Sequence, residues 1–495
     1  MKDKLRRILD GWMSRAVEER GDDVILRLYS RGWISGDPAH AFKDPYAGER
    51  LYYIPRQGGE AGVREATSRL VESSKVPYMS VHDRIEALRS IGEVLEDKMQ
   101  SIASLVAMVT GKPLKEAEAE VEDAVEILNT AATVYDLYSR DLAYSWRGDG
   151  AIRWPWRRGS MLVYGAAPAP LFTTAHGLAH SIVLGMPAIV KPPLAAMLPA
   201  ALLVAAAEEA GLGDSVAMVA GSGPSILDQA SKSGLLDAVA SAGSKATVAS
   251  IIARAPKARH ISLAADNSVA IICSGANIAV AAKSIIESRV QAAGRGCLAT
   301  KAVIAEEEVA GDLVEALISY AETLKPGNPL EAGTSLGPIN GKRRLSHMEA
   351  MIEDAVGRGA QVLYGGRVSR TLYRPVVLDH VDKSSKMLWE KSNVPIIPVV
   401  RVSSCGEALA LAKALPHVDA LLIYADPWHR VADEAARSGF RIVYVNQDLE
   451  RPRVFHECHH PVGSPLLSYP PGRLLASRIV YTGTPLEGVE AEPYR

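Results

Sequence analysis

At residues 188–193 the chain reads Ala188-Ile189-Val190-Lys191-Pro192-Pro193, an apolar run of strand length that ends in a lysine and two prolines. Similar apolar runs occur at residues 161–164, 215–219 and 238–241, and a stretch with helical spacing follows each of them. Strands that alternate with helices in this way favour an open parallel sheet with helices on both faces. The sequence therefore predicts an α/β fold for residues 160–265.

A second α/β series occupies residues 266–460. Its strand-like apolar runs fall at residues 269–272, 302–305, 397–402, 420–424 and 442–445. Together with the first series, this pattern predicts two open α/β domains, each built on a parallel sheet.

The amino-terminal part of the chain has other patterns. Residues 1–20 predict an amphipathic helix, because their apolar residues recur at helical spacing. Residues 25–57 alternate short apolar runs with Gly, Pro and Asp, which predicts strands and turns. Residues 60–140 return to helical spacing, and Gly111-Lys112-Pro113 marks the boundary between two helices.

The composition of the 495 residues is that of an ordinary globular protein, with 48% apolar and 23% charged residues. The net charge of −2 argues against nucleic acid or an anionic membrane as a partner. The most apolar stretch, residues 192–207, is too short to cross a bilayer, and the charged N-terminus lacks the apolar core of a signal peptide. Four cysteines form no disulfide framework in so long a chain and fit a reducing compartment, so we expect a cytoplasmic protein.

Cys297 is the candidate nucleophile of the chain. It follows a helix-like run, in the sequence Ala293-Gly294-Arg295-Gly296-Cys297, where small neighbours leave the thiol sterically open. An accessible thiolate is a strong nucleophile near neutral pH and can hold an acyl group covalently. The alternative is a buried, inert cysteine, which is common for free Cys.

Two features indicate a nucleotide site. Lys191 ends a strand and is followed by prolines, so its side chain is expected in the crevice where open α/β sheets bind ligands; a solvated surface lysine is the alternative. Gly243 and Ser244 follow another strand and open a helix, where a helix N-terminus attracts an anion such as a pyrophosphate. An ordinary helix cap explains the second feature equally well.

Residues 451–460 are rich in Arg and His. Three interpretations are open for this segment: zinc ligands, the polar wall of a substrate pocket, or a solvated loop. No second group of Cys and His is obvious elsewhere in the sequence, so we predict no metal site. In the pocket interpretation the lining residues are Arg453, His456 and Glu457.

Taken in order, these elements resemble the aldehyde dehydrogenase superfamily over nearly the whole chain. The motifs that carry the resemblance are Lys191-Pro192, Gly243-Ser244, Gly294 with Cys297, Gly327-Asn328-Pro329, Gly337-Pro338-Ile339, Glu390 with Pro395, Asn446 and Pro461-Val462-Gly463. Each motif is short, but their common order and spacing match the family.

The resemblance implies an enzyme that oxidises an aldehyde with NAD or NADP. The family's cysteine, here Cys297, attacks the aldehyde, and the thioester left after hydride transfer is released by water or by coenzyme A. Residues 1–140 and 160–263 then form the nucleotide-binding domain, and residues 264–460 form the catalytic domain. Residues 141–159 and 478–495 form a small β oligomerisation arm, as in a homodimer or homotetramer.

The sequence departs from the family's motifs at several positions. Ser262 stands where the family has its general-base glutamate, and Pro168 stands where it has the oxyanion asparagine. Val248, Lys391 and Asn393 replace a glycine, the ribose-binding glutamate and a phenylalanine. Proline supplies no hydrogen-bond donor, and a serine hydroxyl is no useful base near pH 7.

These departures leave two functions open. One is an active dehydrogenase in which coenzyme A replaces water as the acyl acceptor, or in which Glu457 or His456 serves as the base. Arg451 and Arg453 would then favour an anionic aldehyde. The other is a homologue that has lost the chemistry and acts as a binding or structural subunit. The choice between NAD and NADP is open as well, since Leu194 stands where NAD-preferring relatives often have a glutamate.

Overall fold

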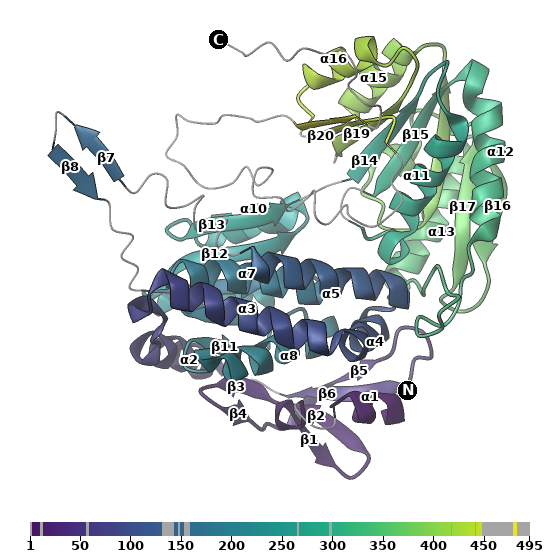
Figure 1. Ribbon diagram of the computed structural model, residues 1–495. Coiled ribbons are helices and arrows are strands. Elements are labelled where there is room, and N and C mark those ends of the chain that lie inside the picture. Colours follow the sequence, from purple (N-terminus) through teal and green to yellow (C-terminus); the bar gives the residue numbers. More distant parts are fainter. Residues whose placement is uncertain are drawn as a thin grey trace. The chain divides into compact units, whose positions relative to one another are not determined.

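The computed structural model of the chain describes residues 2–9, 13–55, 59–130, 143–146, 149–152, 159–264, 267–296, 299–416, 418–440, 442–447 and 479–482 (Figure 1). The chain divides into two compact units. Unit 1 comprises Met1–Ala264, Pro329–Ala332 and His459–Leu474. Unit 2 comprises Ala265–Asn328, Gly333–Cys458 and Leu475–Arg495.

Unit 1 is built on a seven-stranded sheet with the order β13-β12-β9-β10-β11-β3-β4. Its strands are β3 (Leu28–Ser30), β4 (Trp33–Ile34), β9 (Ser160–Tyr164), β10 (Ala188–Lys191), β11 (Val216–Met218), β12 (Leu236–Gly243) and β13 (Arg259–Ala264). From β9 the chain runs outward through β10 and β11, then returns to place β12 on the other side of β9. The point between β9 and β12, where the strand order reverses, is where open α/β sheets bind ligands at the carboxyl ends of the strands.

Helices cover both faces of this sheet. Apolar residues of α2 (Gly59–Ser73), α9 (Gly223–Lys232) and α10 (Lys245–Arg254) pack with Leu162 and Tyr164 of β9. Val163 points to the opposite face, because successive side chains of a strand alternate. There it meets α7 (Pro170–Val183), and a Cβ added at Gly177 would lie 2.3 Å from a Val163 methyl carbon.

Helix α8 (Leu198–Ala207), which follows β10, packs beside α7 and contacts β11. Helices α3 (Val81–Asp97) and α5 (Leu114–Asn129) lie beside α7 (Figure 1), and α4 (Met99–Thr110) packs against α5 and α8. The strand and helix alternation predicted for residues 160–265 is confirmed, and the predicted strand at 188–191 coincides with β10.

The helix predicted for residues 1–20 is wrong beyond its first turns. Helix α1 ends at Leu9, and β1 (Val17–Arg20) pairs antiparallel with β2 (Asp23–Leu26). Gly21, at φ +61°, lies in the tight turn between the two strands, a conformation that glycine adopts without steric cost. Strand pairing here overrides the helical spacing. Together with β5 (Pro38–Lys43) and β6 (Arg50–Pro55), these strands form a separate four-stranded sheet.

Unit 2 contains an eight-stranded sheet with the order β16-β17-β18-β15-β14-β19-β20-β21. Its strands are β14 (Asn267–Ile272), β15 (Thr300–Glu306), β16 (Gln361–Arg367), β17 (Tyr373–Asp379), β18 (Ile396–Val402), β19 (Val418–Tyr424), β20 (Ile442–Val445) and β21 (Ile479–Thr482). All neighbours are parallel except β16 and β17. Its helices are α11 (Ile278–Val290), α12 (Glu307–Thr323), α13 (Lys342–Gly357), α14 (Lys386–Trp389), α15 (Cys405–Ala414) and α16 (His429–Ala436). The predicted α/β class is confirmed, with antiparallel strands added at the edges of both large sheets.

Two segments of the predicted oligomerisation arm are partly described. Strands β7 (Ala143–Trp146) and β8 (Asp149–Ile152) form a hairpin of their own, and β21 pairs with β20 of the same chain. The bridging of subunits by residues 141–159 and 478–495, and a homodimer or homotetramer built on it, stay predictions.

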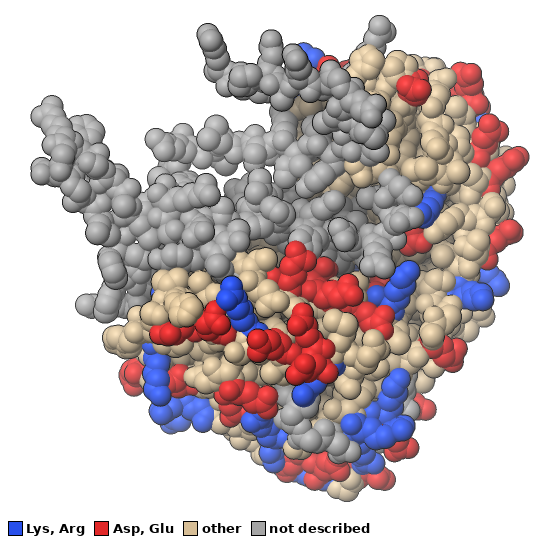
Figure 2. All heavy atoms as spheres, viewed as in Figure 1, with Lys and Arg blue, Asp and Glu red and all other residues tan. Residues whose placement is uncertain are grey.

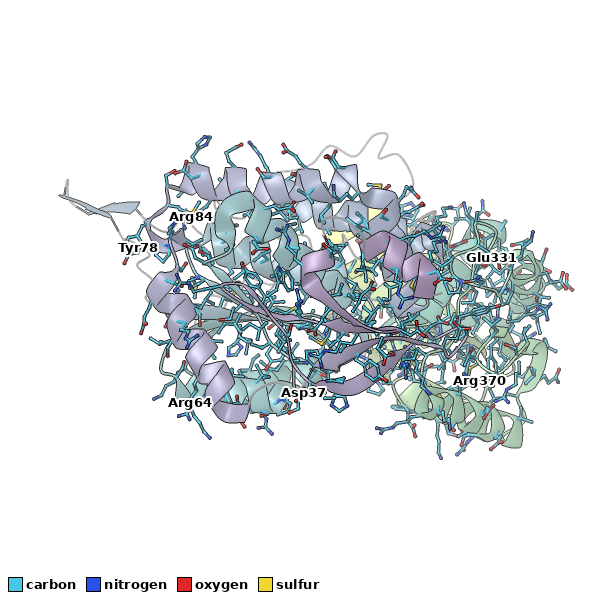
Figure 3. All side chains as sticks on the ribbon, turned by 90° about the horizontal axis from the view of Figure 1, so that it is seen from below. Asp37, Arg64, Tyr78, Arg84, Glu331 and Arg370 are labelled. Atoms are coloured by element: carbon cyan, nitrogen blue, oxygen red, sulfur yellow. A yellow bond between two sulfur atoms is a disulfide. The ribbon has the colours of Figure 1, made fainter. Side chains whose placement is uncertain are left out.

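The described surface carries both signs of charge. Acidic and basic side chains are interspersed on the face that Figure 2 shows. Arg64 and Asp37 are exposed, and Tyr78, which is 80% exposed, projects from the segment ahead of α3 (Figure 3). Among the described helices, none combines the length and the apolar character that a membrane crossing needs.

The prediction of reduced cysteines is wrong for two of them, which form a disulfide. Cys273 follows β14 and Cys405 begins α15, and their Cα atoms lie 5.5 Å apart in a disulfide that joins positions separated by 132 residues. The fold brings the ends of two distant elements together, which no spacing in the sequence announces. The expectation of uniformly reduced cysteines therefore fails for this pair.

Replacing Cys405 with Ser is expected to lower the free energy of unfolding of the oxidised protein by up to about 5 kcal/mol, because the bond restricts a long loop of the unfolded chain. Urea unfolding with and without dithiothreitol measures this. Reduction should not affect the variant. Equal stability of oxidised and reduced wild-type protein would show that the bond contributes nothing.

Candidate active site

The carboxyl edge of the unit 1 sheet collects the candidate nucleotide residues. Lys191 ends β10 beside Tyr164, the last residue of β9, and Ser241 of β12 pairs with Tyr164 from the other side. Gly243 ends β12 two residues later. Tyr164 and Ser241 therefore flank the reversal point between β9 and β12, and Lys191 and Gly243 lie next to it, where a ligand is expected.

Lys191 is a buried lysine and not a solvated one. The residue is 9% exposed, and burial lowers the pKa of its ammonium group. The Nζ atom lies 5.9 Å from the centre of the Tyr164 ring, and the Tyr164 hydroxyl donates to the Gly223 carbonyl at 2.7 Å. A buried cation that faces an aromatic ring at a strand end is well suited to hold an anionic or hydroxyl group of a ligand.

Gly243 and Ser244 form the turn into α10. Gly243 adopts φ +155°, and Ser244 caps the helix, since its hydroxyl oxygen accepts from the Thr247 amide at 3.2 Å. The ordinary cap predicted as an alternative is thus present. It does not compete with an anion, because the positive end of the ten-residue helix still points out of the same turn. Val248, 2% exposed, faces the protein interior one turn later.

Ser262 is fully engaged within the sheet. It is 3% exposed, and its hydroxyl lies 3.1 Å from the hydroxyl of Ser241 on the neighbouring strand. In the loop that holds Pro168, the neighbouring backbone amides already donate hydrogen bonds within the protein. The Ala166 amide donates to the Thr173 hydroxyl at 2.8 Å, and the Ala169 amide donates to the Ala166 carbonyl at 3.2 Å.

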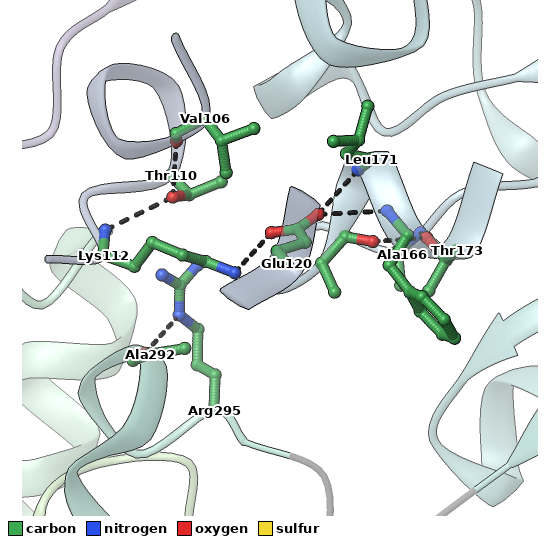
Figure 4. Close-up of polar contacts among 11 residues, drawn as sticks. Val106, Thr110, Lys112, Glu120, Ala166, Leu171, Thr173, Ala292 and Arg295 are labelled. Atoms are coloured by element: carbon green, nitrogen blue, oxygen red, sulfur yellow. Dashed lines mark hydrogen bonds and ion pairs between the residues drawn. The ribbon is translucent and has the colours of Figure 1, made fainter. Parts of the chain in front are cut away.

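A buried ion pair holds the helix that follows this loop. The Glu120 carboxylate accepts from the amides of Leu171 and Phe172, at 2.7 and 3.2 Å, at the N-terminus of α7 (Figure 4). It also pairs with the ammonium group of Lys112, and both residues are 2% exposed. The pair was not predicted from the sequence, where Lys112 marks a helix boundary and Glu120 is one of several acids in the helical stretch that follows. A lysine flanked by Gly and Pro was its only signal.

In unit 2, the structure describes the approach to Cys297. Three consecutive residues of the segment 291–296, which we call the nucleophile loop, have left-handed backbones: Ala292 at φ 49°, Ala293 at φ 55° and Gly294 at φ 83°. The Gln291 carbonyl accepts the amides of residues 294, 295 and 296 at 3.0–3.2 Å. Left-handed alanines are strained, and such strain is concentrated at functional sites. Cys297 itself and the predicted pocket residues Arg453, His456 and Glu457 lie outside the described residues.

Gly294 is fixed by a close backbone contact. A Cβ at this position would lie 2.4 Å from the carbonyl carbon of Val394 and 2.7 Å from its Cα. Only glycine fits, both for its φ and for this approach. The nucleophile loop therefore packs directly on the segment that precedes β18.

Replacing Gly294 with Ala is expected to lower the free energy of unfolding by about 3 kcal/mol or more, since backbone atoms must shift to admit the methyl group. Gly311→Ala is the matched control. Gly311 lies in α12 with nothing within 4 Å of an added Cβ, so alanine there should stabilise by up to about 1 kcal/mol. Denaturant unfolding of both variants measures the contrast, and equal effects would contradict the close contact.

Metal ligands are a separate question. Within the described ranges, no three His, Cys, Asp or Glu side chains are grouped so that they could hold a metal ion. The His-rich segment 451–460 lies outside those ranges, so the prediction of no metal there stays a prediction.

Comparison with known proteins gives the family. The model of the aldehyde dehydrogenase family matches residues 33–460. A malonate-semialdehyde dehydrogenase of Bacillus pumilus is 25% identical over 454 residues, which cover 88% of this chain and 92% of that protein. A lactaldehyde dehydrogenase of Methanococcus maripaludis is 25% identical over 77% of this chain and 82% of its own length. The crystal structure of lactaldehyde dehydrogenase from Escherichia coli superimposes with a TM-score of 0.77 at 22% identity, covering 86% of this chain and 92% of that one. The chain belongs to the aldehyde dehydrogenase family.

Proposed function

We propose that this NAD(P)-dependent aldehyde dehydrogenase uses Cys297 as its nucleophile and transfers the acyl group to a thiol, with coenzyme A as the acceptor. The observation that carries the acceptor is the engagement of Ser262 with Ser241, 3.1 Å apart in the buried sheet. Position 262 therefore offers no carboxylate that could activate water. A thiol needs less help from a base than water does, because it ionises more readily.

The nucleotide edge of unit 1 suits the cofactor. The buried ammonium of Lys191 and the positive end of α10 supply two positive groups, and Gly243 keeps the turn between them free of a side chain. When bound, NAD(P)+ accepts a hydride. We infer that Lys191 holds a ribose hydroxyl or a phosphate, and that Ser244 and the first turn of α10 hold the pyrophosphate.

The chemistry at Cys297 balances in two steps. The Cys297 thiol loses its proton to solvent, and its sulfur bonds to the aldehyde carbon to give a hemithioacetal alkoxide. As the alkoxide oxygen forms the carbonyl of the thioester, the hydride would pass from that carbon to bound NAD(P)+. In the second step the sulfur of coenzyme A bonds to the acyl carbon and the bond to Cys297 breaks, which returns the cysteine thiol. Arg453, His456 and Glu457 are proposed to line the aldehyde pocket, where an arginine favours an anionic aldehyde. Base catalysis by Glu457 or His456 is the competing route to the acyl release.

The test combines nucleotide binding with turnover. Calorimetry should detect NAD+ or NADP+, and Lys191→Met should raise the dissociation constant about tenfold or more, because a charged hydrogen bond is worth about 1.5–3 kcal/mol. Lys232→Met, at an exposed position of α9, is the control and should bind as the wild type does.

Turnover is then followed with an aldehyde panel that includes malonate semialdehyde and lactaldehyde, the aldehydes in the relatives' names. Without coenzyme A we expect one equivalent of reduced nucleotide per subunit, and with it continued turnover and an acyl-CoA product. Sustained turnover in water would favour the base route. Absence of both binding and turnover would favour the binding or structural subunit.

A further inference from the structure

Arg289 is the largest fully buried side chain of the described residues, with no exposed area. It lies in the last turn of α11, eight positions before Cys297 in the sequence. Its guanidinium reaches the segment 390–395, the loop between α14 and β18, from more than a hundred residues away. The helix that leads to the nucleophile is therefore tied to this loop.

The contacts of Arg289 are specific and multiple. Nε donates to the Ile396 carbonyl at 2.8 Å, Nη1 donates to the Ser392 carbonyl at 3.3 Å, and Nη2 donates to the Ser392 hydroxyl. Ser392 is itself 3% exposed. The guanidinium thus binds the backbone at Ser392 in the loop and at Ile396, where β18 begins, which a shorter or apolar side chain cannot do.

These acceptors are neutral. Among the described residues, no carboxylate is paired with Arg289, and burial lowers its pKa to about 9, so that it still carries its charge at neutral pH. Burying a cation against neutral groups costs folding free energy, and well-packed apolar residues are often as stable or more stable in such places. Stability alone is therefore a weak reason for an arginine here.

The loop is held at further points around this contact. Val394 packs against Gly294 of the nucleophile loop, and the Pro395 carbonyl accepts from the Val376 amide of β17 at 3.0 Å. The His347 ring lies 3.4 Å from the Lys391 carbonyl, and Lys391 is partly buried. Contacts on both sides thus hold the backbone of the loop in place.

We propose that Arg289 is a positioning residue that fixes the 390–395 loop relative to the nucleophile loop, so that cofactor binding and the placement of Cys297 are coupled. This role rests on the proposed function, because Lys391 stands where the family's ribose-binding glutamate is found. The guanidinium acts on the cofactor only through the loop. A substitution of Arg289 therefore changes the position of the loop without changing the sequence of the loop.

Arg289→Met tests this, since methionine fills much of the same volume without the charge. We expect faster amide hydrogen exchange in residues 390–396, a nucleotide dissociation constant raised about tenfold, and a kcat lowered about tenfold or more, with the KM for the aldehyde unchanged. Arg289→Lys, which restores one donor, should recover part of the nucleotide affinity. Ser392→Ala removes only the hydroxyl contact and should have a smaller effect.

Lys301→Met is the matched control. Lys301 is another fully buried cation of unit 2, and its Nζ donates to the Pro416 carbonyl at 3.2 Å. Its loss should lower the melting temperature without raising the nucleotide dissociation constant. Equal nucleotide affinity and equal exchange in wild-type and Arg289→Met protein would overturn the positioning role alone. A wild-type protein that binds no nucleotide would refute the proposed function, and this role with it.

Discussion

Replacing Cys297 with Ala should lower the rate of aldehyde oxidation at least about a thousandfold while leaving nucleotide affinity within about twofold of the wild type. Without the nucleophile the covalent intermediate cannot form, so the substitution prevents the reaction rather than slowing one of its steps. Nucleotide binding is expected to survive, because the proposed contacts come from Lys191 and the α10 turn of unit 1. Stopped-flow detection of the reduced nucleotide and calorimetry on the same sample measure both quantities.

The matched control is Cys405→Ser, which removes a thiol from the disulfide and not from the proposed site. It should oxidise aldehyde at the wild-type rate under reducing conditions. Alkylation by iodoacetamide adds a second readout, since Cys297 should react faster than Cys405 in reduced protein and respond to bound nucleotide. Full activity of the Cys297→Ala protein would remove Cys297 from the mechanism.

The sequence predicts an element well when the residues at its ends mark those ends. The prolines after Lys191 end β10 at the predicted residue, because proline cannot continue the ladder. Strand β12 is longer than its predicted core of residues 238–241, since it begins at Leu236, beside an Asp237 carboxylate that accepts from the Gly159 amide at 2.9 Å. A polar residue at a strand end looks like a turn in sequence, and only the partner shows otherwise.

The features missed by sequence reasoning share a dependence on distant residues. Arg289 follows Glu287 and Ser288 in a helix, a polar run that gives no sign of burial, and its partners lie more than a hundred residues later in the chain. Cys273 and Cys405 are equally remote from each other. Helical spacing assigns a residue to a face, but it does not say whether that face meets water or another element. Charged residues inside the fold are therefore the least visible part of a sequence.

The buried pair of Lys112 and Glu120 is expected to be the most sensitive charged contact of unit 1. Glu120→Gln leaves the lysine buried without the charge of its partner and should lower the free energy of unfolding by about 3–5 kcal/mol. Lys112→Met leaves the carboxylate, which keeps the two amide donors of α7, and should cost less. Denaturant unfolding of both single variants and of the double variant gives the coupling between the two side chains.

The exposed pair of Arg89 and Glu86, 2.6 Å apart on α3, provides the contrast. Both side chains are about half exposed, so Arg89→Met should change stability by less than about 1 kcal/mol. The double variant Lys112→Met/Glu120→Gln should be more stable than Glu120→Gln alone, because it no longer buries an ammonium group that has lost the charge of Glu120. A double variant that simply adds the two single losses would mean that the charges do not interact. The amides of Leu171 and Phe172 would then be the whole of Glu120's contribution, and the start of α7, next to Pro168, would depend on hydrogen bonding rather than on charge.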